Sequence, residues 1–169
     1  YEIAQCLVGS EMCIRDRRSG AALISLVLLL VLAVSAGAAS SQNVGVKFWK
    51  ERSDKESMAN SGIDPDRTAT LTRQANGTYT LTLPVTQVSK LGVTGYLSGL
   101  TIGDVTYDGT LTGDFNKATA VLTIKNLPAS VLTGSDVNKS VLVTCNIQMD
   151  LQVLGEINTS ARMCIWNQK

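Results

Sequence analysis

The sequence TYTLTL, residues 78–83, gives the clearest structural signal in this chain of 169 residues. Threonines alternate in it with larger apolar or aromatic side chains, and a period of two places the two kinds on opposite faces of a β-strand. Such a strand has one dry face, which a second sheet or a layer of helices must cover. Because the rest of the chain offers mostly further strands, we predict an all-β, immunoglobulin-like antiparallel β-sandwich.

A turn signal lies just before this strand. The dipeptide NG at residues 76–77 is a strong hairpin signal between two alternating runs. A two-residue turn would set Leu71 opposite Thr82, whereas a three-residue loop at 75–77 sets Leu71 opposite Leu81. Because a slip of one residue reverses every side chain, we predict the three-residue loop, with its glycine in the left-handed conformation.

Alternating runs continue along the chain and predict seven or eight strands in all. They fall at residues 44–49, 68–73, 78–83, 96–107 (as one or two strands), 118–125, 140–151 and 161–166. The charged stretch 50–66 is too polar to be buried as a whole. We expect it to form a rim or lid, with one short helical turn around Met58.

The first residues do not look like part of the protein. The run EMCIRDR at 11–17 resembles a translation of an adapter used in sequencing libraries. We therefore interpret residues 1–17 as a sequencing-adapter artefact and leave them out of the fold prediction. A real cytoplasmic tail is the alternative.

Residues 18–39 have the composition of a signal peptide and are expected to form a signal helix. A basic flank precedes an apolar core at 21–34, and small residues end at Ala38. The core is shorter than the about 20 apolar residues of a membrane span. We expect cleavage near Ala38 and one domain at 40–169, secreted or on the surface of a Gram-positive cell, with membrane contact only through the leader. An uncleaved N-terminal anchor is the alternative.

Composition argues against several functional classes. The formal net charge is only +1 and no basic stripe is present, so a nucleic-acid partner is not expected. The chain contains no histidine, which excludes a histidine-dependent hydrolase. No carboxylate pair marks a glycosidase, no serine stands in a nucleophile elbow, and the aspartates read as turn residues rather than calcium ligands. We therefore expect neither an enzyme nor a metal site.

Cys145 and Cys164 fall on the last two predicted strands, and an exported protein permits their oxidation. Their midpoint coincides with the expected hairpin turn, which allows a disulfide. The alternation of residues 161–166 leaves open on which face of the strand Cys164 lies. If Met163 faces inward, Cys164 lies on the outer face; if Trp166 is buried instead, Cys164 joins it inside.

Four features in order resemble a NEAT domain. They are SMAN at 57–60 after the first strand, the NG hairpin followed by YTL at 79–81, GYL at 95–97, and a final strand ending in Trp166. The resemblance covers residues 44–167. It is nearest to the variants found in surface proteins of clostridia and related Gram-positive bacteria.

This resemblance implies an exported β-sandwich that binds haem between a short helix and the last hairpin, in iron acquisition. It assigns Ser57 a contact with haem and places the ligand surface at Ser57 and Met58. The iron ligand of the family is a tyrosine on the final strand, followed four residues later by a second tyrosine. This sequence departs from the family there, because residues 141–169 contain neither tyrosine nor histidine.

Iron in haem takes an axial donor from His, Met, Cys or Tyr. Near the expected pocket the sequence offers Met58, Met149, Met163 and the two cysteines. Met149 shares a strand face with apolar residues and is expected in the core, and Ser57 is expected to cap a helix. Two hypotheses follow: a cell-surface module that binds haem or a haemoprotein, and a structural or adhesive domain that binds a protein or glycan and no small molecule.

Overall fold

A computed structural model describes residues 39–90, 93–150 and 155–168. The segment 1–17 that we assign to an adapter, and the leader up to Ala38, lie outside the described residues. The side chain of Lys90 is not described either. All structural statements below concern the described part of the chain.

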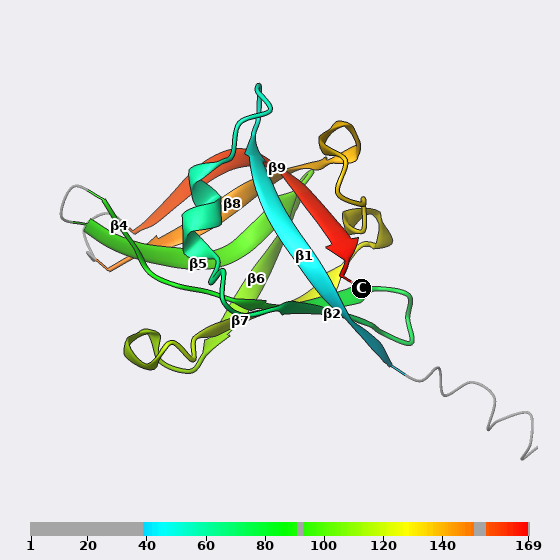
Figure 1. Ribbon diagram of the computed structural model, residues 1–169, viewed down its shortest axis with the longest axis horizontal. Coiled ribbons are helices and arrows are strands. Elements are labelled where there is room, and N and C mark those ends of the chain that lie inside the picture. Colours follow the sequence, from blue (N-terminus) through cyan, green and yellow to red (C-terminus); the bar gives the residue numbers. More distant parts are fainter. Residues whose placement is uncertain (1–38, 91–92, 151–154, 169) are drawn as a thin grey trace, which may run out of the picture. The chain divides into compact units, whose positions relative to one another are not determined.

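Nine antiparallel strands form a single sheet in this part of the chain (Figure 1). They are β1 (Ser40–Lys50), β2 (Ala69–Arg73), β3 (Tyr79–Pro84), β4 (Val88–Lys90), β5 (Val93–Ile102), β6 (Val105–Thr112), β7 (Val121–Leu127), β8 (Val141–Met149) and β9 (Glu156–Asn167). Their order is β4-β5-β6-β7-β3-β2-β1-β9-β8, and β8 pairs back onto β5. Eight strands therefore close into a barrel-like ring, and β4 is an extra strand beside β5.

The all-β, antiparallel prediction is confirmed, but the prediction of two facing sheets is not. One edge of β5 pairs with β4 and then with β6, while its other edge pairs with β8 from Gly95 to Thr101. The register shifts between Leu97 and Gly99, and a Cβ on Gly99 would lie 2.7 Å from the carbonyl oxygen of Tyr107. A bulge beside a glycine lets a strand bend, so hydrogen bonding continues around the ring.

The hairpin of β2 and β3 has the predicted register. Leu71 lies opposite Leu81, and both side chains are fully buried. The loop is closed by the amide of Gln74, which donates to the carbonyl of Thr78 at 2.8 Å. Gly77 has a φ of 83°, which is the left-handed conformation that the three-residue loop requires.

The core consists of the side chains that point into the ring. Alternation along the strands supplies them, and the largest fully buried ones are Phe48, Leu71, Leu81, Leu83, Leu100, Leu122, Ile124, Leu127, Met163 and Ile165. Met163 is thus a core residue, and it faces inward together with Ala161 and Ile165. Trp166 points the other way and packs over Gly45, where a Cβ would meet its ring.

The described helices are single 3₁₀ turns: η1 (Met58–Gly62), η2 (Phe115–Lys117), η3 (Ala129–Val131) and η4 (Val137–Lys139). The first confirms the predicted helical turn around Met58. None of the described helices is long and apolar enough to cross a membrane.

Candidate functional site

The position of η1 is set by hydrogen bonds to one residue of β1. The side chain of Asn60 accepts from the amide of Phe48 at 2.8 Å and donates to its carbonyl oxygen at 2.7 Å. The same carbonyl accepts from the amide of Ser57 at 2.9 Å. Because Asn60 satisfies both backbone groups of Phe48, the 3₁₀ turn is fastened to the barrel wall.

Ser57 is the N-cap of η1, as the sequence predicts. Its backbone is extended and its hydroxyl accepts from the amide of Ala59 at 3.3 Å. A capping oxygen of this kind satisfies an amide that the helix leaves without a partner. Ser57 is not among the described residues that line the cavity below, and nothing in the structure tests the haem contact that the resemblance assigns to it.

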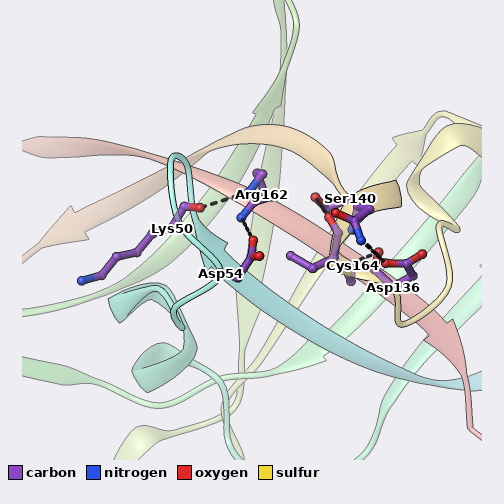
Figure 2. Close-up of polar contacts among 8 residues, drawn as sticks. Lys50, Asp54, Asp136, Ser140, Arg162 and Cys164 are labelled. Carbon is purple, nitrogen blue, oxygen red and sulfur yellow. Dashed lines mark hydrogen bonds and ion pairs between the residues drawn. The ribbon is translucent and has the colours of Figure 1, made fainter.

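A second tie holds the loop between β1 and η1. Arg162 of β9 donates to the carbonyl oxygen of Lys50 at 3.1 Å and to the carboxylate of Asp54 at 2.7 Å, as Figure 2 shows. Arg162 also lies opposite Trp49 in the register of β1 and β9. The segment that leads into η1 is therefore fixed to the neighbouring strand.

An open cavity of about 390 Å³ lies between η1, the β4–β5 pair and the β8–β9 hairpin. Figure 1 shows η1 as the cyan-green coil next to β5, which it contacts. The lining residues are mostly aliphatic or thioether side chains: Met58, Ala59, Gly62, Val88, Val93, Gly95, Tyr96, Leu97, Ile147, Met149, Ile157 and Thr159. This is the place that the sequence predicts for the ligand surface, beside Met58 and the last hairpin.

The apolar lining results from strands that continue past the core. Cys145 lies opposite Thr159 and Ile147 opposite Ile157 in the β8–β9 register. All four have the parity of the inward-facing core residues, but only Cys145 is buried, because the ring is open at this end. At the mouth, Ile157 is 44% exposed and Met58 is 55% exposed. Exposed apolar side chains around one hollow are typical of a binding site.

Two of the five predicted donors reach the cavity. Met58 and Met149 line it, while Met163 and Cys145 are fully buried in the core. Burial also raises the pKa of the Cys145 thiol to about 12, so the thiolate form is disfavoured. The prediction that Met149 belongs to the core is wrong, because β8 extends beyond the core and its last residue is only half-buried.

Sequence reasoning missed Gly95 as part of the site. A Cβ at this glycine would lie 2.8 Å from the sulfur of Met149, 2.9 Å from the carbonyl oxygen of Gln148 and 3.3 Å from Ile147. Only the missing side chain leaves room for the Met149 thioether at the cavity wall. The GYL run at 95–97 contained the signal, because a glycine inside a strand marks a close approach.

Tyr96 is among the residues that line the cavity, but its ring packs on the other side of β5. Gly95 and Leu97 are buried on the inner side of β5, so alternation turns Tyr96 toward the opposite side. Its ring packs against Phe115 of η2, with centroids 5.4 Å apart. The phenol of Tyr96 therefore does not replace the tyrosine that the last strand lacks.

Cys145 and Cys164 are both unbonded, so the disulfide that the sequence allows is not formed in this structure. Cys145 lies opposite Thr159, five residues before Cys164 on the same strand. Cys164 also has the opposite parity, since Met163 is the inward-facing residue. Its sulfur donates to the carbonyl oxygen of Asp136 at 3.6 Å, beneath the loop that leads into η4 (Figure 2).

Among the described residues, no group of three or more His, Cys, Asp or Glu side chains is arranged to hold a metal ion. A second hollow of about 190 Å³ lies beside Trp166 and Arg67. There Arg67 donates to the carboxylate of Asp64 at 2.7 Å and lowers the pKa of that carboxyl, with help from the amide of Asp66. Arg67 and Asp64 of the second hollow already bind each other, so it is the weaker candidate.

The solved structures that resemble this chain include two of one domain. One is the NEAT5 domain of IsdX2, a haemophore of B. anthracis, in complex with haem, and the other is a point mutant of that domain in complex with haem. Each has a TM-score of 0.50 and 10% sequence identity, and covers 78% of this chain and 98% of the solved chain. No protein-family model matches the sequence, and no curated protein is significantly similar to it. The likeness establishes a NEAT-like fold.

Proposed function

We propose that this chain is an exported, non-enzymatic binding module whose apolar cleft holds a flat, largely apolar ligand, with haem as the first candidate. The single observation that carries the proposal is the open cavity between η1 and the β8–β9 hairpin. Its volume of about 390 Å³ lies within the range of small-molecule sites. The haem complexes of the structurally similar NEAT5 domain support the choice of ligand.

The lining residues fit a porphyrin better than a polar ligand. Aliphatic side chains from five elements surround the hollow, and among the described lining residues Thr159 brings a hydroxyl group to it, since the ring of Tyr96 packs against Phe115. Haem, when bound, supplies an iron atom that needs an axial donor, and a methionine sulfur is an accepted one. Met58 and Met149 are the thioethers that would hold it.

A binding role is preferred to catalysis because of the same lining. General acid–base chemistry needs a titratable group with a pKa near the working pH. The described wall offers no carboxylate, imidazole or amine. We therefore propose capture of the ligand rather than its conversion.

Export and cell-surface location are proposed from the leader at 18–39 alone. A surface location would suit a module that takes up haem, or haem from a haemoprotein, for iron acquisition. We propose the clostridial type of NEAT domain from the resemblance carried by SMAN at 57–60, the NG hairpin, GYL at 95–97 and the final strand ending in Trp166. The structural or adhesive alternative would be favoured by an occluded cleft, whereas the cavity beside Met58 is open.

A pair of matched substitutions tests the site. Ile157 and Leu142 are exposed aliphatic residues on the last hairpin, 44% and 56% exposed, but only Ile157 lines the cavity. Ile157→Glu would place a charge that ligand binding must desolvate, and we expect it to weaken haemin binding by at least about tenfold. Leu142→Glu should leave affinity unchanged.

The measurement is a titration of the purified chain with haemin, followed by the Soret band and by quenching of tryptophan fluorescence. Saturable changes in the unsubstituted chain, lost in the Ile157 variant only, support the proposal. Absence of any saturable change, or equal losses in both variants, would remove haem as the ligand of this cleft.

A further inference from the structure

We infer that Met149 supplies the axial donor to haem iron in this cleft, and that the cleft consequently binds ferrous haem more tightly than ferric haem. This inference rests on the proposed function. It assigns a ligand from β8 where the resemblance leads one to expect a tyrosine on the last strand.

Most of the candidate iron donors among the described residues lie away from the cavity. Met163 and Cys145 are in the core, and Cys164 lies on the outer face of β9 beneath the Asp136 loop. Tyr96 turns away from the cavity and packs against Phe115. The soft donors that remain at the cavity are the thioethers of Met58 and Met149.

These two methionines differ in how far they are exposed to water. Met58 is more than half exposed and lies on the rim, at the start of a 3₁₀ turn of five residues. Met149 is half-buried at the end of β8, inside the wall of the cavity. A donor inside the wall is shielded from water, which competes for iron at an exposed rim.

Met149 is held in a fixed position by its neighbours. Its amide donates to the carbonyl oxygen of Gly155 at 3.1 Å, and the next amide, that of Asp150, donates to the carbonyl oxygen of Thr94 at 2.8 Å. Met149 also lies opposite Gly95, whose missing Cβ accommodates the sulfur. Backbone bonds on both sides and a notch shaped for the sulfur hold the donor in place before any ligand arrives.

The chemistry of a thioether donor decides which oxidation state of iron is preferred. A thioether is neutral and soft, while a tyrosine phenolate is anionic and hard. Methionine ligation stabilises reduced iron and raises its reduction potential. No carboxylate of the described lining offsets this preference. The donor set therefore favours the ferrous state.

The experiment measures the affinity of the full chain for three probes: haemin, haemin reduced with dithionite in the absence of oxygen, and iron-free protoporphyrin IX. Met149→Leu removes the sulfur at nearly constant volume. Met163→Leu makes the same change in the core and is the matched control. Absorption spectra of the ferrous complexes report ligation directly, independently of affinity.

We expect the unsubstituted chain and Met163→Leu to bind ferrous haem about tenfold more tightly than ferric haem, equal to about 1.4 kcal/mol. In Met149→Leu this preference should disappear and the ferrous spectrum should change, while protoporphyrin IX binds all three chains equally. An unchanged spectrum and ratio in Met149→Leu would overturn the assignment of the donor. Equal affinity for the two iron states in the unsubstituted chain would overturn it as well, yet leave the proposed function standing if porphyrins bind. If no porphyrin binds, both fail.

Discussion

Single residues of the site show what sequence reasoning can and cannot reach. Ser57 has a serine's ordinary tendency to cap, and the sequence predicts this role from local pattern alone. The roles of Asn60 and Gly95 depend on partners in other strands, Phe48 and Met149, which no local pattern identifies. For Cys164 the sequence leaves two parities open, and only the burial of Met163 selects between them.

Cys145 makes the stability of the fold depend on pH. Burial raises the pKa of its thiol from 9.0 to about 12. Above about pH 9 the unfolded chain loses this proton while the folded chain keeps it, so the free energy of unfolding falls as pH rises from about 9 toward 12. Below the unfolded pKa the contribution is fully present and constant.

We expect the urea midpoint of the unsubstituted chain to fall between about pH 9 and pH 11, and to fall less steeply in Cys145→Ala. Below about pH 9 the variant should be less stable by about 1–2 kcal/mol, because it leaves a small cavity. The difference between the two slopes is the readout, since it cancels the other titrating groups. Parallel slopes would show that this thiol is not protected by burial.

At the scale of elements, the hairpins differ in how far sequence predicts them. The β2–β3 hairpin has an NG turn and a strict alternation, and these fix its register. The β8–β9 hairpin has no comparable signal, and its strands begin and end differently from the runs expected at 140–151 and 161–166. The inward parity of Met149 predicts a core position, whereas the strand end that it occupies forms a wall of the cavity.

The attachment of η1 to β1 gives a prediction at this scale. Asn60→Ala would leave the amide and carbonyl of Phe48 without their side-chain partner, and we expect a loss of about 1–3 kcal/mol of stability. The rim formed by η1 should loosen, so haemin affinity should fall as well.

Asn138→Ala is the control for this change, because Asn138 is exposed and its side chain contacts only the nearby Asp136 among the described residues. It should alter stability by no more than about 0.5 kcal/mol. Chemical denaturation and haemin titration of both variants provide the comparison. If the two variants have the same stability and the same haemin affinity, the hydrogen bonds from Asn60 to Phe48 do not position η1.

At the scale of the whole molecule, the sequence predicts the all-β fold class but not the closing of the sheet into a ring. Alternating threonines and aliphatics indicate antiparallel strands. The ring depends on β5 pairing with β8, two strands far apart in the chain, and on a bulge at Leu97. The result is one closed wall, with η1 and the apolar cavity at one end of it. The NEAT-like fold follows from this arrangement despite 10% identity with the solved domains.

The location of the ligand site can be measured from backbone amide chemical shifts, recorded as protoporphyrin IX is added to the chain. We expect saturable shifts concentrated in η1, the first half of β5 and the β8–β9 hairpin, with the second hollow beside Arg67 and Trp166 unchanged. Shifts centred on the second hollow, or no saturable shifts at all, would show that the cleft beside η1 is not the ligand site.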